Sequence, residues 1–279
     1  MKPLAIMTLI LLPALAWSQR DESSWKFENR ETIRRSFDVS SASTAKKLLV
    51  DNMNGFIHIN GYAGKEVQVT VEKHIRARSS DSLAEAQRDV KLDMSQQGNS
   101  VRLYEDGPFL NHGGGDGDRG YRVDFDFEIR VPSDTELTLK GFNQEMQVKQ
   151  VAGDFDIHGF NGGIDMQDVS GSGSVDTFNG KVKVAFSKNP ARQTNFKTFN
   201  GSVDVYFQPT LDADLHFKTF HGSIYTDFEV SALRSGESKN GKFVYRSSNR
   251  MTAGRTGKGG PELSFDTFNG SIRLHSKAL

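Results

Sequence analysis

The chain has 279 residues, with 35 Lys plus Arg, 35 Asp plus Glu and no cysteine. The balanced charge gives no reason to expect a nucleic acid or an anionic membrane surface as a partner. Without cysteine the chain forms no disulfide, no Cys-based metal site and no lipid-modified N-terminal cysteine. Its 27 Gly and 20 Phe residues suit a structure with many tight turns and a Phe-rich interior.

Residues 1–18 have the pattern of a removable signal peptide. Lys2 supplies the positive charge, residues 4–15 are almost all apolar, and Ala14-Leu15-Ala16 fits a small-residue cleavage site. The apolar run is too short to span a bilayer. Cleavage after Ala16 and after Ser18 both fit, and no transmembrane segment is expected after cleavage. We therefore expect an exported protein, in the periplasm, on the cell surface or secreted.

The segment after the signal peptide predicts extended structure. Residues 19–45 are polar and of mixed charge, and they indicate an extended lead-in with one strand near 33–39. Residues 46–120 predict a β-rich N-terminal part. Its first element covers residues 47–59, in which Met53 stands where Phe stands in later repeats.

Several turns divide the rest of this N-terminal part. Asn60-Gly61 predicts a turn, and the alternation of Val67, Val69 and Val71 with polar residues predicts a half-buried strand. Residues 90–104 predict a hairpin that turns around Gly98. Residues 107–120 are Gly-rich and predict a flexible loop.

Residues 81–88 are the best helix candidate of the mature chain. Ser80 or Asp81 is expected to cap this helix, and Glu85 stands close to capping-box spacing. It is the one short helix that we expect in an otherwise all-β protein.

Residues 121–279 are dominated by a repeat built around Phe-Asn-Gly. Its Phe positions step by 18, 18, 21, 21 and 48 residues, and each copy lies between two short runs in which apolar and polar residues alternate. Self-similarity at this period is the signature of stacked repeats, whose apolar faces close into one core. The expected fold is an all-β, right-handed parallel β-helix or β-solenoid with about 18–21 residues per coil. Its core should contain the alternating apolar residues from Leu137 to Ile224.

The turn of each repeat predicts a ladder of like side chains along the stack. Asn-Gly tolerates the positive φ that a sharp corner needs. Equivalent Asn side chains of neighbouring coils can hydrogen-bond to one another, and the Phe rings before them should stack likewise. The structural turn ladder consists of Phe142, Asn143, Phe160, Asn161, Gly162, Phe178, Asn179, Gly180, Phe199, Asn200, Gly201, Phe220, His221, Gly222, Phe268, Asn269 and Gly270.

A row of charged residues accompanies the ladder. Opposite charges that face each other on neighbouring strands contribute roughly 0.2–1 kcal/mol. Asp176 beside Lys197 is therefore favourable, whereas Lys197 beside Lys218 is not. Mixed signs of this kind indicate a solvated face. The row consists of Lys140, His158, Asp176, Lys197, Lys218 and Asp266.

Residues 229–262 interrupt the repeat with a basic, Gly/Ser-rich insertion. Within it, residues 240–244 are predicted to form a degenerate coil. The coil over 262–274 is then expected to close the stack almost at the C-terminus.

The repeat resembles a known family. The unit (Asp/Lys)-Thr-Phe-Asn-Gly-(Ser/Lys)-(Val/Ile)-x-(Val/Leu), together with the approach segment 130–139, is similar to the bacterial putative-adhesin β-solenoid family of the head-GIN-like type. The similarity covers residues 45–279, most of all 121–274. It implies an exported domain of the cell envelope or surface whose function is largely unknown. The sequence departs from the family pattern at Gln144, at His221 and in the insertion.

An enzymatic alternative starts from the aspartates. Parallel β-helix lyases and hydrolases use clustered carboxylates with a basic residue in a concave site. Because the aspartates here alternate with core residues on a narrow rod, solvated outward positions are favoured and no catalytic residue is assigned. The candidates are Asp154, Asp156, Asp165, Asp168 and Asp204, with Lys183 as the basic partner.

Metal and cofactor sites are not expected. Residues 114–118 resemble one copy of a glycine/aspartate calcium repeat, but a calcium site of this type needs several stacked copies. The seven histidines contain no close ligand pair in the sequence. His158 and His221 occupy repeat positions, so a structural role is expected for them.

The leading hypothesis is a non-enzymatic, exported, adhesin-like β-solenoid that binds a protein or glycan of the cell envelope or surface. One alternative is a carbohydrate-active β-helix enzyme, a polysaccharide lyase or hydrolase. Another is a structural module that assembles end to end through an uncapped apolar end at Leu274, because exposed strand edges invite pairing. The sequence alone sets neither the ligand nor the oligomeric state.

The ladder model predicts the effect of two substitutions. Asn179→Ala removes one amide from the ladder, and Val182→Asp places a charge in the expected core. Both variants should lower the melting temperature in one cooperative transition. Thermal melting followed by circular dichroism checks this, and unchanged melting of both variants would contradict the ladder.

Overall fold

The computed structural model describes residues 25–41, 44–108, 119–232 and 251–277. The predicted signal peptide, most of the Gly-rich loop and most of the basic insertion with its candidate coil lie outside these ranges. Within these ranges the regular structure consists of strands and one short helix, and most strand pairings are parallel. The all-β class is confirmed. No helix among the described residues has the length and apolar character needed to cross a membrane.

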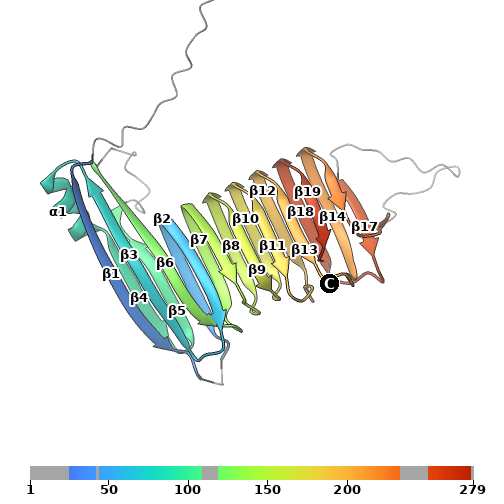
Figure 1. The fold of residues 1–279 in the computed structure, drawn as a ribbon, viewed down its shortest axis with the longest axis horizontal. Helices are drawn as coiled ribbons and strands as arrows, with labels where there is room; N and C mark the ends of the chain where they lie inside the picture. The colour runs from blue at the N-terminus through green and yellow to red at the C-terminus, as the bar shows by residue number, and fades with distance from the viewer. Residues whose placement is uncertain (1–24, 42–43, 109–118, 233–250, 278–279) are drawn as a thin grey trace, which may run out of the picture.

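The N-terminal part lies along one edge of the long strand β2, and β7 pairs with the other edge (Figure 1). The first half of β2 pairs with β5, and its second half pairs with β6. β4 lies outside β5, whereas β3 and then β1 lie outside β6. The elements are β1 Phe27–Asp38, β2 Lys47–Tyr62, β3 Glu66–Ala77, α1 Ser80–Asp89, β4 Lys91–Gln97, β5 Ser100–Asp106, β6 Tyr121–Pro132 and β7 Glu136–Lys149.

Residues 27–38 of the predicted lead-in form an edge strand. β1 pairs antiparallel with β3 along its full length, well beyond the strand predicted at 33–39. Its exposed side chains are largely charged, among them Glu31, Arg34 and Arg35. Charges along an exposed edge discourage pairing with other chains.

The turn predicted at Asn60-Gly61 is wrong. Both residues lie inside β2, which is bonded to β6 on one side and to β7 on the other. Glycine is needed at position 61 because a Cβ there would lie 1.9 Å from the carbonyl oxygen of Gln150. Close packing, not a turn, explains this glycine.

The single helix, α1, begins one residue earlier than predicted and has a different cap. The Oγ atom of Ser79 accepts a hydrogen bond of 3.1 Å from the backbone N–H of Ser82. Ser79 therefore satisfies a free N–H of the first turn, in place of Ser80 or Asp81. The hairpin around Gly98 is confirmed, as is the strand that buries Val67, Val69 and Val71.

From β7 onward each repeat contributes two short strands joined by the Phe-Asn-Gly turn. First strands pair in parallel with first strands, and second strands with second strands. The first series is the first half of β7, β8 Phe155–Asn161, β10 Gly173–Asn179, β12 Thr194–Asn200, β18 Glu262–Asn269 and β14 Ala213–His221. The second series is the second half of β7, β9 Ile164–Val169, β11 Val182–Phe186, β13 Val203–Phe207, β19 Ile272–Ser276 and β15 Ile224–Thr226.

The two series face each other across an apolar core. Phe186 of the second series meets Phe196 of the first series edge to face, with ring centroids 6.1 Å apart. Val182 and the other predicted inward residues of the repeats are buried, except that Ile224, at the end of the second series, is only partly buried. Each fully buried Val or Phe side chain contributes about 1.5–3 kcal/mol, so this core holds the two series together.

The order of the repeats in space differs from their order in the sequence. β18 pairs with β12 on one side and with β14 on the other, and β19 lies in the same way between β13 and β15 (Figure 1). The prediction that the last coil closes the stack is therefore wrong, because that coil is an interior one. Leu274 is buried between Val205 and Thr226 and does not form an apolar end.

The inserted strand also corrects the predicted charge clash. Asp266 of β18 is paired with Lys197 on one side and with Lys218 on the other. The Lys218 ammonium lies 3.3 Å from the Asp266 carboxylate. The two lysines are thus separated by an aspartate, and the charges alternate where like charges had been expected.

The first series ends in an antiparallel strand. β17 (Met251–Thr256) pairs with the outer edge of β14, and the short β16 (Ser231–Ala232) pairs with β17. Arg255 of β17 forms two hydrogen bonds, of 2.6 and 2.9 Å, with the carboxylate of Asp214. This strand covers the edge that a further repeat would otherwise need to cover.

Close packing, more than a positive φ, explains the glycines at the corners between the two strands of each repeat. Of the five ladder glycines only Gly162 has a positive φ, of 140°. A Cβ on Gly201 would lie 1.9 Å from the carbonyl oxygen of Gly180, and Gly180, Gly222 and Gly270 have equally close neighbours. The predicted reason for these glycines is therefore corrected: the next repeat's backbone occupies the space of the side chain.

This packing predicts that Gly201→Ala destabilises the fold by on the order of 1–3 kcal/mol, because the neighbouring backbone must move to admit the methyl group. Gly163→Ala is the matched control, since its Cβ would find its nearest neighbour at an ordinary 3.4 Å. Denaturant unfolding of both variants checks the prediction. Equal stability of the two variants would show that the corner at Gly201 accommodates a methyl group without a shift of the neighbouring backbone.

Candidate functional site

Six Phe rings form one exposed column on the outer face of the first series. Neighbouring ring centroids lie 4.7–5.1 Å apart, and the ring planes are within 2–7° of parallel. The rings are 37–52% exposed. In spatial order this Phe column consists of Phe142, Phe160, Phe178, Phe199, Phe268 and Phe220.

A column of Asn side chains runs beside the Phe column. Each Asn amide donates a hydrogen bond to the side-chain oxygen of the preceding Asn, at 2.7–3.2 Å. At the far end Nδ1 of His221 lies 3.1 Å from Oδ1 of Asn269, so the histidine replaces the asparagine within the column. The column begins at Asn54 of β2, which the sequence analysis did not assign to the ladder although it recognised Met53 beside it.

Threonine side chains behind the Phe column hold each turn to its neighbour. The Oγ1 atom of Thr198 donates a 2.8 Å hydrogen bond to the carbonyl oxygen of Gly180. Thr177, Thr267 and Thr219 make the equivalent bond to the glycine of the adjacent repeat. Because these threonines are buried, the backbone from which the Phe rings project is fixed.

The predicted charged row lies next to the Phe column on the same face. In spatial order its members are Lys140, His158, Asp176, Lys197, Asp266 and Lys218. A hydrogen bond with Asp176 raises the pKa of His158 to about 9, and Asp156 contributes from the other side of the ring. At neutral pH the imidazole is therefore a cation.

The ring orientation limits what the Phe column can bind. Because the rings are stacked, each inner ring has both faces covered by its neighbours and presents only its C–H edge to solvent. A cation binds an aromatic side chain over the face of the ring, and a sugar stacks there as well. The column therefore presents a continuous apolar ridge of ring edges.

The five candidate aspartates are not brought together. Asp156 lies on the outer face of the first series, Asp165 and Asp204 lie on the second series, and Asp154 and Asp168 lie near the opposite corner. Each has a basic partner: Arg192 for Asp154, His158 for Asp156, Lys183 for Asp165, Lys277 for Asp168, and Lys181 with Arg273 for Asp204.

Asp204 departs from the solvated position that was expected. It is only 3% exposed. Burial alone would raise the pKa of Asp204, but hydrogen bonds from Lys181 and Ser202 hold that pKa below its usual value. Its carboxylate is thus a structural anion that ties neighbouring strands of the second series together.

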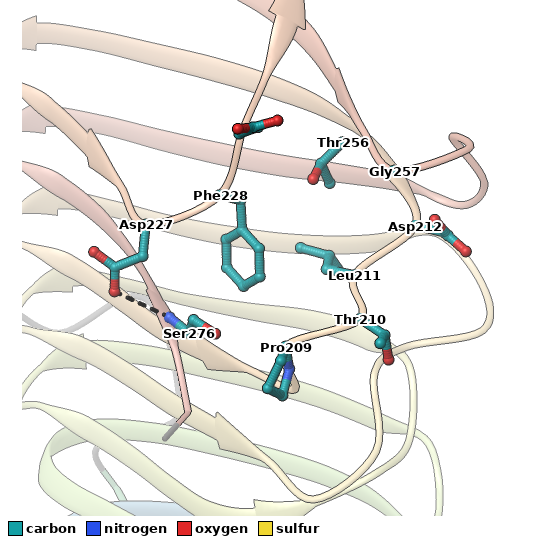
Figure 2. Close-up of a pocket in the computed structure, with 10 residues that line it drawn as sticks. Pro209, Thr210, Leu211, Asp212, Asp227, Phe228, Thr256, Gly257 and Ser276 are labelled. Carbon is teal, nitrogen blue, oxygen red and sulfur yellow. Dashed lines mark hydrogen bonds between the residues drawn. The ribbon is translucent and has the colours of Figure 1, made fainter. Parts of the chain in front are cut away.

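A shallow pocket of about 440 Å³ lies at the C-terminal end of the repeats (Figure 2). Phe228 and Leu211 supply its apolar wall. Asp227 accepts a hydrogen bond from the backbone N–H of Ser276, and Asp212 accepts one from that of Lys258. These carboxylates hold loops in place and do not converge on a common point in the pocket.

Comparisons with known proteins find likeness at the level of solved structures. No family model and no curated protein matches the chain. The crystal structure of a putative cell adhesion protein from Clostridium sporogenes is 14% identical, with a TM-score of 0.46, and the match covers 89% of this chain and 100% of that chain. A putative adhesin from Bacteroides fragilis is 12% identical, with a TM-score of 0.38 and coverage of 88% and 97%. A putative lipid binding protein from Parabacteroides distasonis is 12% identical, with a TM-score of 0.29 and coverage of 89% and 95%.

One buried carboxyl lies beside Met53, next to Asn54, at which the Asn column begins. Glu105 of β5 is 2% exposed, and its Oε2 accepts a 2.7 Å hydrogen bond from the backbone N–H of Met53. Burial raises the pKa of Glu105 to about 7, although that hydrogen bond and the charge of Lys73 lower it. In the unfolded chain the pKa of the same carboxyl lies near its ordinary value of 4.5.

The raised pKa predicts a pH-dependent effect of Glu105→Gln. The folded state holds the Glu105 proton more tightly, so this group's contribution to stability falls as pH rises from about 4.5 to 7, and the full penalty remains above pH 7. The variant keeps an oxygen for the Met53 N–H without a charge. It should be more stable than the wild type at pH 8 by on the order of 3 kcal/mol, and similar at pH 4. Urea unfolding at both pH values checks this; an equal difference at pH 4 and pH 8 would show that the carboxyl is not titrating.

Proposed function

We propose that this chain is an exported, non-enzymatic, adhesin-like protein that binds a protein of the cell envelope or surface through the Phe column. The observation that carries the proposal is the exposure of six aligned Phe rings on one face. Soluble proteins rarely expose continuous apolar surface without a binding role. With about 200 Å² for a Phe side chain, the observed exposures correspond to roughly 500 Å² of apolar surface.

The repeats that carry the column are proposed to wind as a right-handed β-solenoid. The parallel pairing of residues 18–21 positions apart supports this winding. The right hand follows from the general preference of parallel strand crossovers. In this arrangement the turn ladder is a structural scaffold that keeps the Phe column straight. The predicted signal peptide supports export to the periplasm, the cell surface or the medium.

A protein partner fits the Phe column better than a glycan. Stacked rings present edges, whereas sugar stacking uses ring faces. Only the two terminal rings, Phe142 and Phe220, each have a face without a Phe neighbour in the column. An extended glycan would therefore find no series of faces along the column, but an apolar protein surface can bury the whole ridge.

The enzymatic alternative is less well supported. Its aspartates are distributed over separate faces, and each is neutralised by a basic neighbour. A general acid needs a carboxyl whose pKa is raised toward neutrality in a concave site. Asp204, the most buried of the five, has a lowered pKa instead.

Binding to cells tests the proposed function. The chain from residue 19 onward is labelled with a fluorophore and added to cells of the producing organism, and bound fluorescence is measured by flow cytometry. The triple variant Phe160→Thr, Phe178→Thr, Phe199→Thr keeps β-forming residues but removes the middle of the ridge. We expect its binding to fall by at least about tenfold, because buried apolar area drives association.

A matched triple variant on the opposite face serves as the control. Gln147→Ser, Gln167→Ser and Ala185→Ser change outward residues of the second series and should leave binding unchanged. Circular dichroism establishes that both triple variants are folded. Equal binding by the Phe triple variant would remove the column from the binding site, and shortening of envelope glycans, detected by mass spectrometry, would replace adhesion with enzymatic activity.

A further inference from the structure

We propose that the partner of the Phe column is a second copy of this chain, docked face to face with the two columns antiparallel. This inference rests on the proposed function and names its partner, which makes the adhesion homophilic. The docking has a twofold axis that runs along the strand direction, between the repeats of Phe178 and Phe199. Such an interface is isologous, because the same surface serves both copies.

The twofold axis places each row of the face opposite the same row of the other copy in reverse order. Phe178 then meets the partner's Phe199, and Phe160 meets the partner's Phe268. The two ridges of ring edges lie against each other along their length. Five centroid steps of 4.7–5.1 Å make each ridge about 24 Å long.

The charged row is complementary to itself in this arrangement. Asp176 faces the partner's Lys197, and the His158 cation faces the partner's Asp266. Symmetry produces each of these contacts twice, so four of the six facing pairs join opposite charges. The exception is Lys140 opposite the partner's Lys218, which occurs at the two ends of the interface where water screens the repulsion.

The charged row also selects a single register. If one copy slides by one repeat in one direction, Asp176 faces the partner's Asp176 and His158 faces the partner's Lys197. If it slides in the other direction, Lys197 faces the partner's Lys197 and Asp176 faces the partner's Asp266. Both shifts place like charges at the centre, where repulsion between facing charges suppresses incorrect pairing.

This complementarity depends on the insertion of β18. Without it Lys218 would be the neighbour of Lys197, and the row would contain one acidic residue among five members. A row with one acid cannot complement itself. The position of Asp266 between Lys197 and Lys218 therefore gives the charged row the second acidic residue that it needs to complement itself.

The neighbouring rows contain no conflict. Beyond the charged row, Ser174 faces the partner's Asn195, and Asp156 faces the partner's Ser264, both pairs that can hydrogen-bond. On the other side of the Phe column, Asn179 faces the partner's Asn200. All of these side chains lie on the exposed or half-exposed outer face.

The area available is adequate for a specific dimer. The Phe column alone presents roughly 500 Å² of apolar surface. A standard interface buries about 800 Å² per partner. The charged row and the Asn column border the ridge on both sides and supply the remainder, so the interface has an apolar centre and a polar rim.

Sedimentation equilibrium of the mature chain with charge-swapped variants tests the dimer. The wild type should form a dimer. Lys197→Asp alone and Asp176→Lys alone should each raise the dimer Kd by at least about tenfold, because each creates two like-charge contacts per dimer. An equimolar mixture of the two variants should form a heterodimer with nearly the wild-type Kd, since each altered residue then faces its opposite. If Lys197 and Asp176 interacted only within one chain, mixing the two variants would not restore the wild-type Kd.

Spin-label distances provide a second measurement in a nearly unaltered chain. Because the chain lacks cysteine, Ser174→Cys carries one label per copy. Face-packed sheets lie about 10 Å apart, so the two labels should give a short distance, under roughly 20 Å. The control Lys183→Cys, on the outer face of the second series, should give a distance longer by about two sheet thicknesses.

The outcomes separate this inference from the proposed function. A wild type that is monomeric in sedimentation, or a variant mixture without rescue, overturns the homophilic dimer. If such a chain still loses cell binding on removal of the Phe ridge, the proposed adhesion stands with a different protein as partner. Binding only to cells that carry the gene, and not to deletion cells, supports a second copy as the partner.

Discussion

The in-register parallel pairing of the repeats is the constraint on which the rest of the structure depends. It gives every position its equivalent in the next repeat as a neighbour, at the roughly 4.8 Å spacing of paired strands. An amide can then bond to an amide and a ring can stack on a ring, and at the corners that carry glycine a neighbouring backbone occupies the space of the missing side chain. In-register pairing is thus the common cause of stability and surface pattern, because it both forms the Asn ladder and aligns the edges of the Phe rings.

The same constraint makes charge the variable part of the repeat. Apolar, Asn and Thr positions accept their own kind as a neighbour, but a charged position does not. The chain satisfies this requirement by alternation, as in Lys197, Asp266 and Lys218, and by pairing Asp165 with Lys183 on the opposite face. Alternation lowers repulsion within one copy, and on a row with a central twofold it also creates complementarity between copies.

Much of the fold follows from local pattern, and what does not follow has identifiable causes. The spacing of the Phe-Asn-Gly turns and the alternation of residues such as Val182 and Val203 were sufficient for strand positions and inward faces. The sequence order of the repeats was misleading, because strand pairing depends on like residues and not on adjacency in the chain, so β18 can lie between β12 and β14. Asp204 and Glu105 were missed as buried groups, since a lone acidic residue in a strand carries no local sign of the partners that compensate its burial. The exposure of the Phe rings was equally hidden, because alternation identifies the face that packs into the core but not whether another part of the chain covers the opposite face.

The interior position of β18 and β19 determines when the native strand pairings can form during synthesis. During synthesis the chain emerges from its N-terminus, and β14 with β15 emerges before β18 with β19. The native neighbours of β14 therefore do not exist until residues 262–276 have followed, and an interrupted chain would instead have β12 as its best match, with Lys218 beside Lys197. Residues 262–276 thus separate β12 from β14 and β13 from β15, and the native order of these strands forms only after those residues have been synthesised.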